Sequence, residues 1–204
     1  DMEVTVDSIT FDSRIVTQGS TFVAIPGNQV DGHQFISPAI ERGAIVIICE
    51  VFPEVRIDGV TYVQVVDSAK ALGVMASNFY DHPSEKLKIV AITGTNGKTT
   101  IATLLHQLFM ELGHISGLLS TVENKINDKI IPATHTTPDV LSINELLMEM
   151  LKAGCTHCFM EASSHAIVQE RLAGLKISGA VFTNISHELR TPLTLILGPI
   201  EELI

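Results

Sequence analysis

The first 84 residues alternate between short β-branched or aromatic runs and stretches with the spacing of helices. Three of the runs are predicted to be strands, at residues 21–25, 44–50 and 61–66. Two of the stretches are predicted to be helices, at residues 33–42 and 67–80. Asp67 and Ser68 are candidates for the cap of the second helix. The polar segment 81–86 contains Pro83 and has the composition of a linker.

From residue 87 the pattern changes to a regular exchange of strand and helix. The apolar run KIVAIT, residues 88–93, is typical of a parallel strand that is buried on both faces. A helix is predicted to open at Thr137 and Pro138 and to close at Gly154. The remaining strands are predicted at 115–121, 156–162 and 177–184, the remaining helices at 98–112 and 164–173, and a loop or hairpin at 122–135. This alternation predicts a mainly parallel sheet with right-handed crossovers.

Composition and charge narrow the possible functions. Hydrophobic residues make up 46% of the 204 residues, which is enough for a core, but no run approaches the roughly 18 apolar residues of a membrane helix. The first residues have neither the basic start nor the apolar stretch of a signal peptide, so we expect a cytoplasmic protein. The net charge of −10 argues against a nucleic-acid partner. Helix N-termini can still bind small anions locally.

The cysteines suggest a reduced protein. There are three, Cys49, Cys155 and Cys158, and an odd number without a secretory signal is typical of free thiols. The last two form a C-x-x-C motif, but it follows a predicted helix and runs into a strand, whereas a thioredoxin-type motif opens a helix. A second ligand pair with the spacing of a zinc site is missing. Buried structural thiols are the favoured interpretation.

The strongest chemical signal is the segment AITGTNGKTT, residues 91–100, which follows a buried strand and opens a helix. Gly94 and Gly97 allow a tight turn that points backbone N–H groups inward. Lys98 can reach phosphate oxygens and Thr99 can place a hydroxyl on Mg²⁺. An ordinary glycine turn is the alternative. The usual phosphate loop has a glycine where Ile92 stands, so this is the shorter G-x-x-G-K-T-T form. The predicted ATP-binding residues are Gly94, Thr95, Asn96, Gly97, Lys98, Thr99 and Thr100.

That shorter form resembles the Mur ligase family, the ATP-dependent amide-forming enzymes of peptidoglycan synthesis. Four further segments extend the resemblance to about residues 3–186, in the order of the family: 12–14 (DSR), 31–34 (DGHQ), 136–139 (TTPD) and 160–165 (MEASSH). They are most similar to the members that extend UDP-N-acetylmuramoyl-L-alanyl-D-glutamate by a diamino acid. The resemblance implies ATP and Mg²⁺ as cofactors, with the UDP-muramoyl-dipeptide and a diamino acid as substrates. It also implies a role in cell-wall biogenesis, cell shape and cell division.

The resemblance also implies a set of binding residues. Ser13, His33, Gln34 and Phe35 would contact the uridine end of the substrate. Thr136, Thr137, Ser163, Gln169 and Arg171 would hold the muramoyl-peptide, and His135 stands where many relatives have asparagine. Without the motifs, these residues would be helix caps, loop histidines and surface side chains.

The implied chemistry is the activation of a carboxylate. ATP would convert the carboxylate into an acyl phosphate, which an amine then attacks, and such phosphoryl transfer relies on positioning and charge neutralisation. Lys98 and Glu161 would be the catalytic residues, with Thr99 and Glu161 as Mg²⁺ ligands. Glu161 stands at the carboxyl end of its strand, where open α/β sheets bind their ligands. Without the motif it would be a solvated carboxylate at a strand end.

The last residues follow a different pattern. The segment FTNISHELRTPL resembles the phosphoacceptor helix of sensor histidine kinases, with His187 as the phosphoacceptor. Leu189, Leu193, Ile196, Ile200 and Leu203 form a two-heptad apolar seam that suits self-association. The family's further histidine-rich segment, carbamylated lysine and third domain do not follow residue 187. The simplest expectation is a chimera of a truncated ligase with a kinase fragment.

We therefore predict an α/β fold with three parts: a uridine-nucleotide domain at 1–84, a partial P-loop ATPase domain at 85–186 and a kinase-like helix at 187–204. The first functional hypothesis is ATP-dependent amide ligation. The second is a nucleotide-binding fragment without turnover. A histidine-kinase phosphoacceptor module is the third hypothesis, and it rests on about 20 residues.

Overall fold

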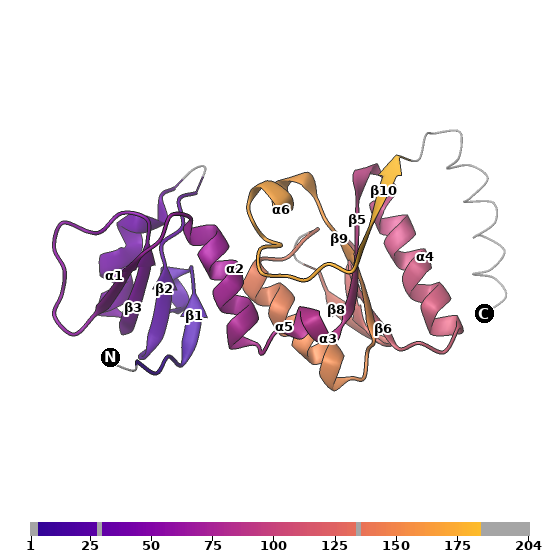
Figure 1. The fold of residues 1–204 in the computed structure, drawn as a ribbon, viewed down its shortest axis with the longest axis horizontal. Coiled ribbons are helices and arrows are strands. Elements are labelled where there is room, and N and C mark those ends of the chain that lie inside the picture. Colours follow the sequence, from indigo (N-terminus) through magenta and orange to yellow (C-terminus); the bar gives the residue numbers. More distant parts are fainter. Residues whose placement is uncertain (1–3, 28–29, 134–135, 185–204) are drawn as a thin grey trace. The chain divides into compact units, whose positions relative to one another are not determined.

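The computed structural model describes residues 4–27, 30–133 and 136–184 (Figure 1). The chain forms two compact units. The first comprises the residues up to Asp81 together with Leu172–Gly174, and the second comprises His82–Arg171 and the residues from Leu175 onward. Within the described ranges, no helix is both long and apolar enough to cross a bilayer.

A parallel sheet forms the centre of the first unit. Its order is β1-β2-β3-β4 among the described residues, and every neighbouring pair is parallel. The strands are β1 (Ser8–Thr10), β2 (Ser20–Val23), β3 (Ala44–Cys49) and β4 (Thr61–Gln64). The predictions for 21–25, 44–50 and 61–66 are confirmed within two residues at each end. Strand β1 was not predicted, because three residues are too few for a periodic signal.

The helices of the first unit are η1 (Ser13–Ile15), η2 (Gly32–Phe35), α1 (Ile36–Glu41) and α2 (Ser68–Phe79). The first lies between β1 and β2, the next two lie between β2 and β3, and α2 follows β4. The Asp67 side chain caps α2 by accepting from the N–H of Lys70, as predicted. Gly73, in the middle of α2, lies against the backbone of Ala173, where any Cβ would overlap it. The core comprises Val16, Phe22, Ala24, Ile36, Ala39, Ala44, Ile47 and Cys49.

The second unit contains a mixed sheet, ordered β10-β5-β9-β6-β7-β8 among the described residues. The strands are β5 (Lys88–Asn96), β6 (Ser116–Leu119), β7 (Glu123–Ile126), β8 (Lys129–Pro132), β9 (His157–Glu161) and β10 (Gly179–Asn184). The first four strands in this order pair in parallel, and β7 and β8 continue the sheet as an antiparallel hairpin. The predictions of a mainly parallel sheet and of a hairpin within 122–135 are confirmed.

Helices cover both faces of this second sheet, with α4 and α5 on opposite sides (Figure 1). They are α3 (Pro83–Lys86), α4 (Lys98–Glu111), α5 (Val140–Lys152) and α6 (Ser164–Val168). On the α4 side, Ala102 packs with Ile92, Leu118 and Phe159 of three adjacent strands. On the α5 side, Gly117 of β6 lies against the Met150 side chain and has no space for a side chain of its own.

Two helix ends differ from the predictions, and one helix was not predicted. The cap of α5 is Asp139, whose carboxylate accepts from the N–H groups of Leu141 and Ser142, so the predicted start at Thr137 was wrong. Helix α6 ends at Val168 instead of residue 173, because Glu170 adopts a left-handed conformation with φ 54°. A non-glycine residue in that conformation leaves no sequence signal. The segment with linker composition contains α3.

The cysteines are buried free thiols, as expected. Burial raises the pKa of the Cys155 thiol. The pKa of the Cys158 thiol is also raised, by burial and by the neighbouring Cys155. Raised pKa values keep both thiols protonated, which makes them poor nucleophiles and poor metal ligands.

Asn144 provides a test of packing on α5. Its side chain is fully buried and its amide donates to the carbonyl of Val140 at 2.8 Å, while its Oδ1 has no partner among the described residues. Replacing Asn144 with Leu removes the unpaired acceptor and keeps the branching of the side chain, although the methyl groups of Leu are larger than the amide atoms that they replace. We expect Asn144→Leu to leave the free energy of unfolding unchanged or to raise it by about 1 kcal/mol in urea denaturation. A loss of more than about 1 kcal/mol would contradict this assignment.

Two histidines of the second unit link stability to pH. Burial lowers the pKa of His106, whose Nδ1 lies 2.8 Å from the Ser116 hydroxyl, and burial together with Lys88 and His114 lowers the pKa of His157. Between these lowered values and the ordinary value of 6.5, the unfolded chain binds more protons than the folded chain. The free energy of unfolding should therefore fall as the pH is lowered from 7.5 to 5.5. Urea denaturation at several pH values should give a shallower dependence for His106→Asn, and an equal dependence would contradict the assignment.

Candidate functional site

The segment 93–100, which comprises the end of β5, Gly97 and the start of α4, forms the centre of the candidate site in the second unit and is called the loop below. Strand β5 lies between β9 and β10, with Ile92 opposite Glu161 and Gly94 opposite Thr183. All three strands are parallel, so their carboxyl ends meet at one edge of the sheet. Ligands of open α/β sheets bind at this edge.

The glycines of this loop have the conformations that the motif predicts. Gly94 has φ 138° and Gly97 has φ 81°, both of which side chains disfavour. Gly97 is the N-cap residue of α4, so the free N–H groups of the first turn follow directly after it. Lys98 folds back over the loop, and its Nζ donates to the carbonyl of Gly94 at 2.9 Å. The result is a closed turn of backbone amides with one ammonium group above it.

Thr183 of β10 holds this loop from the neighbouring strand. Its side chain is buried, and its hydroxyl lies 2.7 Å from the carbonyl of Asn96 and 3.2 Å from the carbonyl of Thr93. A Cβ at Gly94 would overlap the carbonyl oxygen of Thr183. Thr183 was not predicted to be a site residue, although it lies in the segment FTNISH. One signal could have identified it, because it stands at the end of a strand that was predicted to be parallel.

Glu161 ends β9 at the same edge and is only 1% exposed. One carboxylate oxygen accepts from the N–H of Thr121 at 2.8 Å, and the other accepts from the Thr121 hydroxyl at 3.1 Å. The ion pairs found among the described residues do not include Glu161. Without the motif, Glu161 would have been expected to be a solvated carboxylate at a strand end. The structure shows it buried instead.

Thr137 connects the segments on the other side of Glu161. Its side chain is 1% exposed, and its hydroxyl donates to the carbonyl of Glu161 at 2.9 Å and accepts from the N–H of Ser163 at 3.2 Å. The Arg171 guanidinium donates to the Thr137 carbonyl at 2.6 Å and to the Gln169 side chain at 3.0 Å. The structure thus brings together four of the residues predicted to hold the muramoyl-peptide. The Thr137 hydroxyl is already used internally.

The remaining predicted residues of this unit are placed less tightly. Thr95, Asn96 and Thr100 are exposed, and Thr99 and Thr136 are half-buried. His135 and His187 lie outside the described residues.

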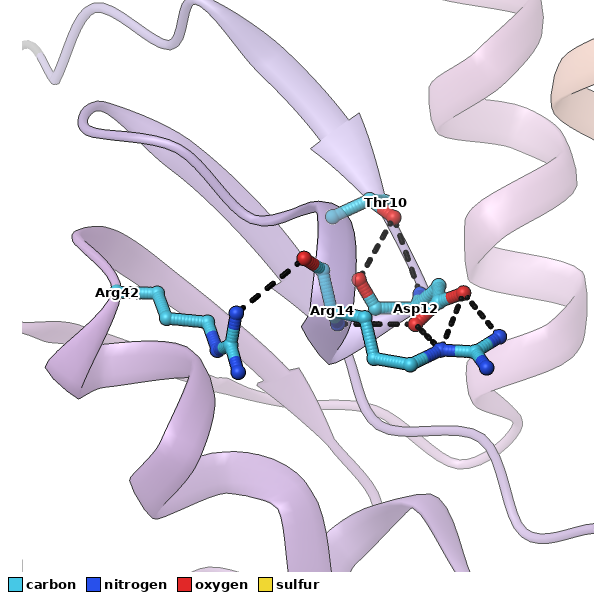
Figure 2. A network of polar contacts seen from close by, with 4 residues as sticks. All are labelled: Thr10, Asp12, Arg14 and Arg42. Atoms are coloured by element: carbon cyan, nitrogen blue, oxygen red, sulfur yellow. Dashed lines mark hydrogen bonds and ion pairs between the residues drawn. The ribbon is translucent and has the colours of Figure 1, made fainter.

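In the first unit, the segment Asp12–Arg14 forms a closed polar network (Figure 2). Asp12 caps η1, and its carboxylate accepts from the Arg14 backbone N–H at 2.9 Å and from the Arg14 guanidinium at 2.7 to 3.1 Å. These hydrogen bonds lower the pKa of Asp12. The Thr10 hydroxyl hydrogen bonds to the carbonyl and the N–H of Asp12, and the Arg42 guanidinium donates to the carbonyl of Arg14. Ser13, the predicted uridine contact, is the first residue of η1 and is half-buried.

His33 contacts other parts of the first unit through both ring nitrogens. Its Nδ1 lies 2.7 Å from the Asp31 carboxylate, and its Nε2 accepts from the N–H groups of Glu50 and Val51 at 2.9 and 3.3 Å. Because Nε2 accepts, the proton must be on Nδ1. Gln34 donates to the Asp31 carbonyl, and Phe35 is 38% exposed. A cavity of about 430 Å³ adjoins this segment, lined by Pro26, Asp31, His33, Ile36, Glu50, Val51, Phe52 and Pro53.

The donor set of the second unit fits a hard divalent cation with anionic phosphates. Glu161 offers carboxylate oxygens with free lone pairs, and Thr99 offers a hydroxyl in the first turn of α4. Oxygen ligands of this kind suit Mg²⁺, which keeps several waters and takes few protein ligands. Among the described residues, no group of three or more His, Cys, Asp or Glu side chains is placed so that it could hold a metal ion by itself.

Comparison with protein families matches both units. Residues 92–188 match the Mur ligase middle domain, and residues 5–80 match the model described as Mur ligase family, catalytic domain. The two matches follow each other in the chain and leave only a short segment between them.

Two relatives and one solved structure that resemble this chain carry the same name. A UDP-N-acetylmuramoyl-L-alanyl-D-glutamate–2,6-diaminopimelate ligase of Cytophaga hutchinsonii is 58% identical over 91% of this chain and 38% of its own length. A protein of the same name from Bacteroides fragilis is 50% identical over 92% of this chain and 38% of its own length. A solved structure with that name matches with a TM-score of 0.75 and 30% identity over 89% of this chain and 37% of its own. The chain thus spans a little over a third of the relatives that it matches.

The close approach at Gly94 can be tested by substitution. Gly94→Ala would place a methyl group on the Thr183 carbonyl in a conformation that alanine disfavours. We expect the free energy of unfolding to fall by at least about 3 kcal/mol. Gly113→Ala is the matched control, because Gly113 has φ 80° but an added Cβ meets nothing within 4 Å. The control should cost about 1–2 kcal/mol. Equal losses in chemical denaturation would show that the contact with Thr183 is unimportant.

Proposed function

The chain belongs to the Mur ligase family across residues 5–80 and 92–188, and we propose that it serves an ATP-dependent amide ligase of peptidoglycan precursor synthesis. The proposed reaction joins a diamino acid to the D-glutamate of UDP-N-acetylmuramoyl-L-alanyl-D-glutamate. The names of the relatives support 2,6-diaminopimelate as that amino acid.

The main support for this proposal is the arrangement of the phosphate loop with Glu161. A loop of left-handed glycines, a lysine above it and a buried carboxylate on the adjacent strand meet at one sheet edge. The loop offers amide donors and a cation to phosphate oxygens, and the carboxylate offers an anionic ligand to a metal. ATP with Mg²⁺ requires this combination, whereas an ordinary glycine turn would have no need for the buried carboxylate.

Each residue has a proposed task at this edge. The N–H groups of residues 94–98 and the start of α4 bind the phosphates through hydrogen bonds and the helix dipole. Lys98 exchanges its bond to the Gly94 carbonyl for a phosphate oxygen, which costs little because one hydrogen bond replaces another. Thr99 and Glu161 would hold Mg²⁺, which would neutralise phosphate charge when it is bound. The substrate carboxylate, a poor electrophile, would take the γ-phosphoryl group of ATP to give an acyl phosphate and ADP, and the amine would then displace phosphate to form the amide.

The first unit is proposed to bind the uridine end of the substrate. Ser13 is the first residue of η1, which the Asp12 carboxylate caps, and its hydroxyl is a candidate for contact with the ligand. His33 has both nitrogens engaged, which favours a structural role beside the cavity over direct contact through its ring. Gln34 and Phe35 remain candidates for contact. If these residues contact the uridine end, the first unit would bind the substrate without help from the phosphate loop of the second unit.

We expect Lys98→Ala to abolish ATP binding, or to weaken it by at least tenfold, because the loop loses its ammonium group. Binding of the UDP-muramoyl-dipeptide should stay unchanged. Isothermal titration calorimetry with ATP and Mg²⁺, and separately with the UDP-muramoyl-dipeptide, measures both. Lys88→Ala is the matched control, because Lys88 is exposed at the opposite end of the same strand.

The outcomes separate the possibilities. Loss of ATP binding in Lys98→Ala but not in Lys88→Ala supports the phosphate loop. Undiminished ATP binding by Lys98→Ala would contradict it. ATP binding without phosphate release, in the presence of both substrates, would favour the nucleotide-binding fragment over a ligase that turns over.

A further inference from the structure

Thr121 is the residue that fixes the carboxylate of Glu161. Its N–H and its hydroxyl each bind a different carboxylate oxygen, at 2.8 and 3.1 Å. Two hydrogen bonds from one residue fix both the position and the plane of the carboxylate. Among the described residues, no other side chain or backbone group binds these oxygens. The orientation of Glu161 therefore depends on Thr121.

The turn that carries Thr121 is held rigid by its own side chains. The Ser120 hydroxyl donates to the Glu123 carbonyl at 2.7 Å, and the Ser120 N–H donates to the Asn124 side chain at 3.3 Å. Asn124 is buried in β7. The turn follows directly after β6, the neighbour of β9, so it lies at the same edge of the sheet as Glu161. Thr121 is thus preorganised, although it is exposed.

The backbone of Glu161 is fixed separately. Its carbonyl accepts from the Thr137 hydroxyl, and its strand pairs with β5 through Ile92. Thr137 holds the main chain while Thr121 holds the side chain, so the two threonines have different effects. A change at Thr121 can release the carboxylate without disturbing the strand.

We propose that Thr121 is a positioning residue that directs the Glu161 carboxylate toward a divalent cation bound with the phosphates of a nucleotide. The inference rests on the proposed function of the second unit. Each oxygen of Glu161 accepts one hydrogen bond from Thr121 and keeps a further lone pair for a metal. Groups that orient a metal ligand in this way affect metal affinity by about 10- to 100-fold.

Three variants test this role. Thr121→Val keeps the shape and the N–H but removes the hydroxyl, Thr121→Ser restores the hydroxyl, and Glu161→Gln removes the anionic ligand. Thr156→Val is the matched control, because Thr156 is an exposed threonine before the opposite end of β9 and hydrogen bonds there to His157 and Ile115. Thermal denaturation checks that every variant is folded.

The readout is the affinity for Mn²⁺, measured by electron paramagnetic resonance in the presence of ATP, together with the gain in ATP affinity on adding Mg²⁺. Thr121→Val should weaken Mn²⁺ binding by about tenfold or more. Its ATP affinity without metal should be unchanged. Thr121→Ser and Thr156→Val should bind Mn²⁺ like the unmodified chain.

The results distinguish the two levels of the proposal. If Mn²⁺ binding is lost in Glu161→Gln but unchanged in Thr121→Val, the positioning role is wrong and the metal site stands. If Glu161→Gln itself binds Mn²⁺ and ATP like the unmodified chain, the metal site of the proposed function is wrong. A loss in Thr156→Val equal to that in Thr121→Val would show a general effect on the sheet and would overturn the inference.

Discussion

The backbone of Gly94 lies so close to the backbone of Thr183 that a single methyl group would not fit between them. The two backbones come this close because β5 and β10 pair in parallel. The arrangement of the loop depends on this close contact. The Thr183 hydroxyl can reach the loop carbonyls only from this position, and Lys98 can cover the loop only because the chain turns sharply at Gly94. The proposed phosphate loop is therefore held in place by two strands, although only one of them carries the motif.

The same parallel arrangement explains why the acidic residue is buried. Strand β9 lies beside β5 and ends at the same edge, so Glu161 emerges where the loop begins. Burying a carboxylate costs free energy unless hydrogen bonds compensate it, and Thr121 supplies two of these. The Glu161 carboxylate is thus held by two hydrogen bonds and has no cation partner among the described residues. Such an oriented anion is suited to bind a cation. Thr137 then joins this edge to Ser163 and Arg171.

Much of this could be predicted from the sequence, because the signals were local. The apolar run of β5, the glycines after it and the Asp67 cap each act within a few residues, and each was confirmed. The cap of α5 was predicted wrongly because Thr137 and Asp139 are both good caps, and only a contact with Glu161 across the fold decides between them. Thr121 and Thr183 were missed for the same reason, since their partners lie 40 and 87 residues away in the chain. In the first unit, contact of His33 with the substrate stays a prediction, and the structure adds that its ring connects η2 to the residue that follows β3.

The proposed function requires the carboxyl edge of the second sheet to bind a nucleotide together with its metal. The decisive measurement is a crystal structure of the chain with a non-hydrolysable ATP analogue and Mg²⁺. It should show the phosphates on the amides of residues 94–98, Lys98 moved from the Gly94 carbonyl to a phosphate oxygen, and a metal at Glu161. A nucleotide bound elsewhere, or a Lys98 that keeps its bond to Gly94 beside bound phosphates, would contradict it.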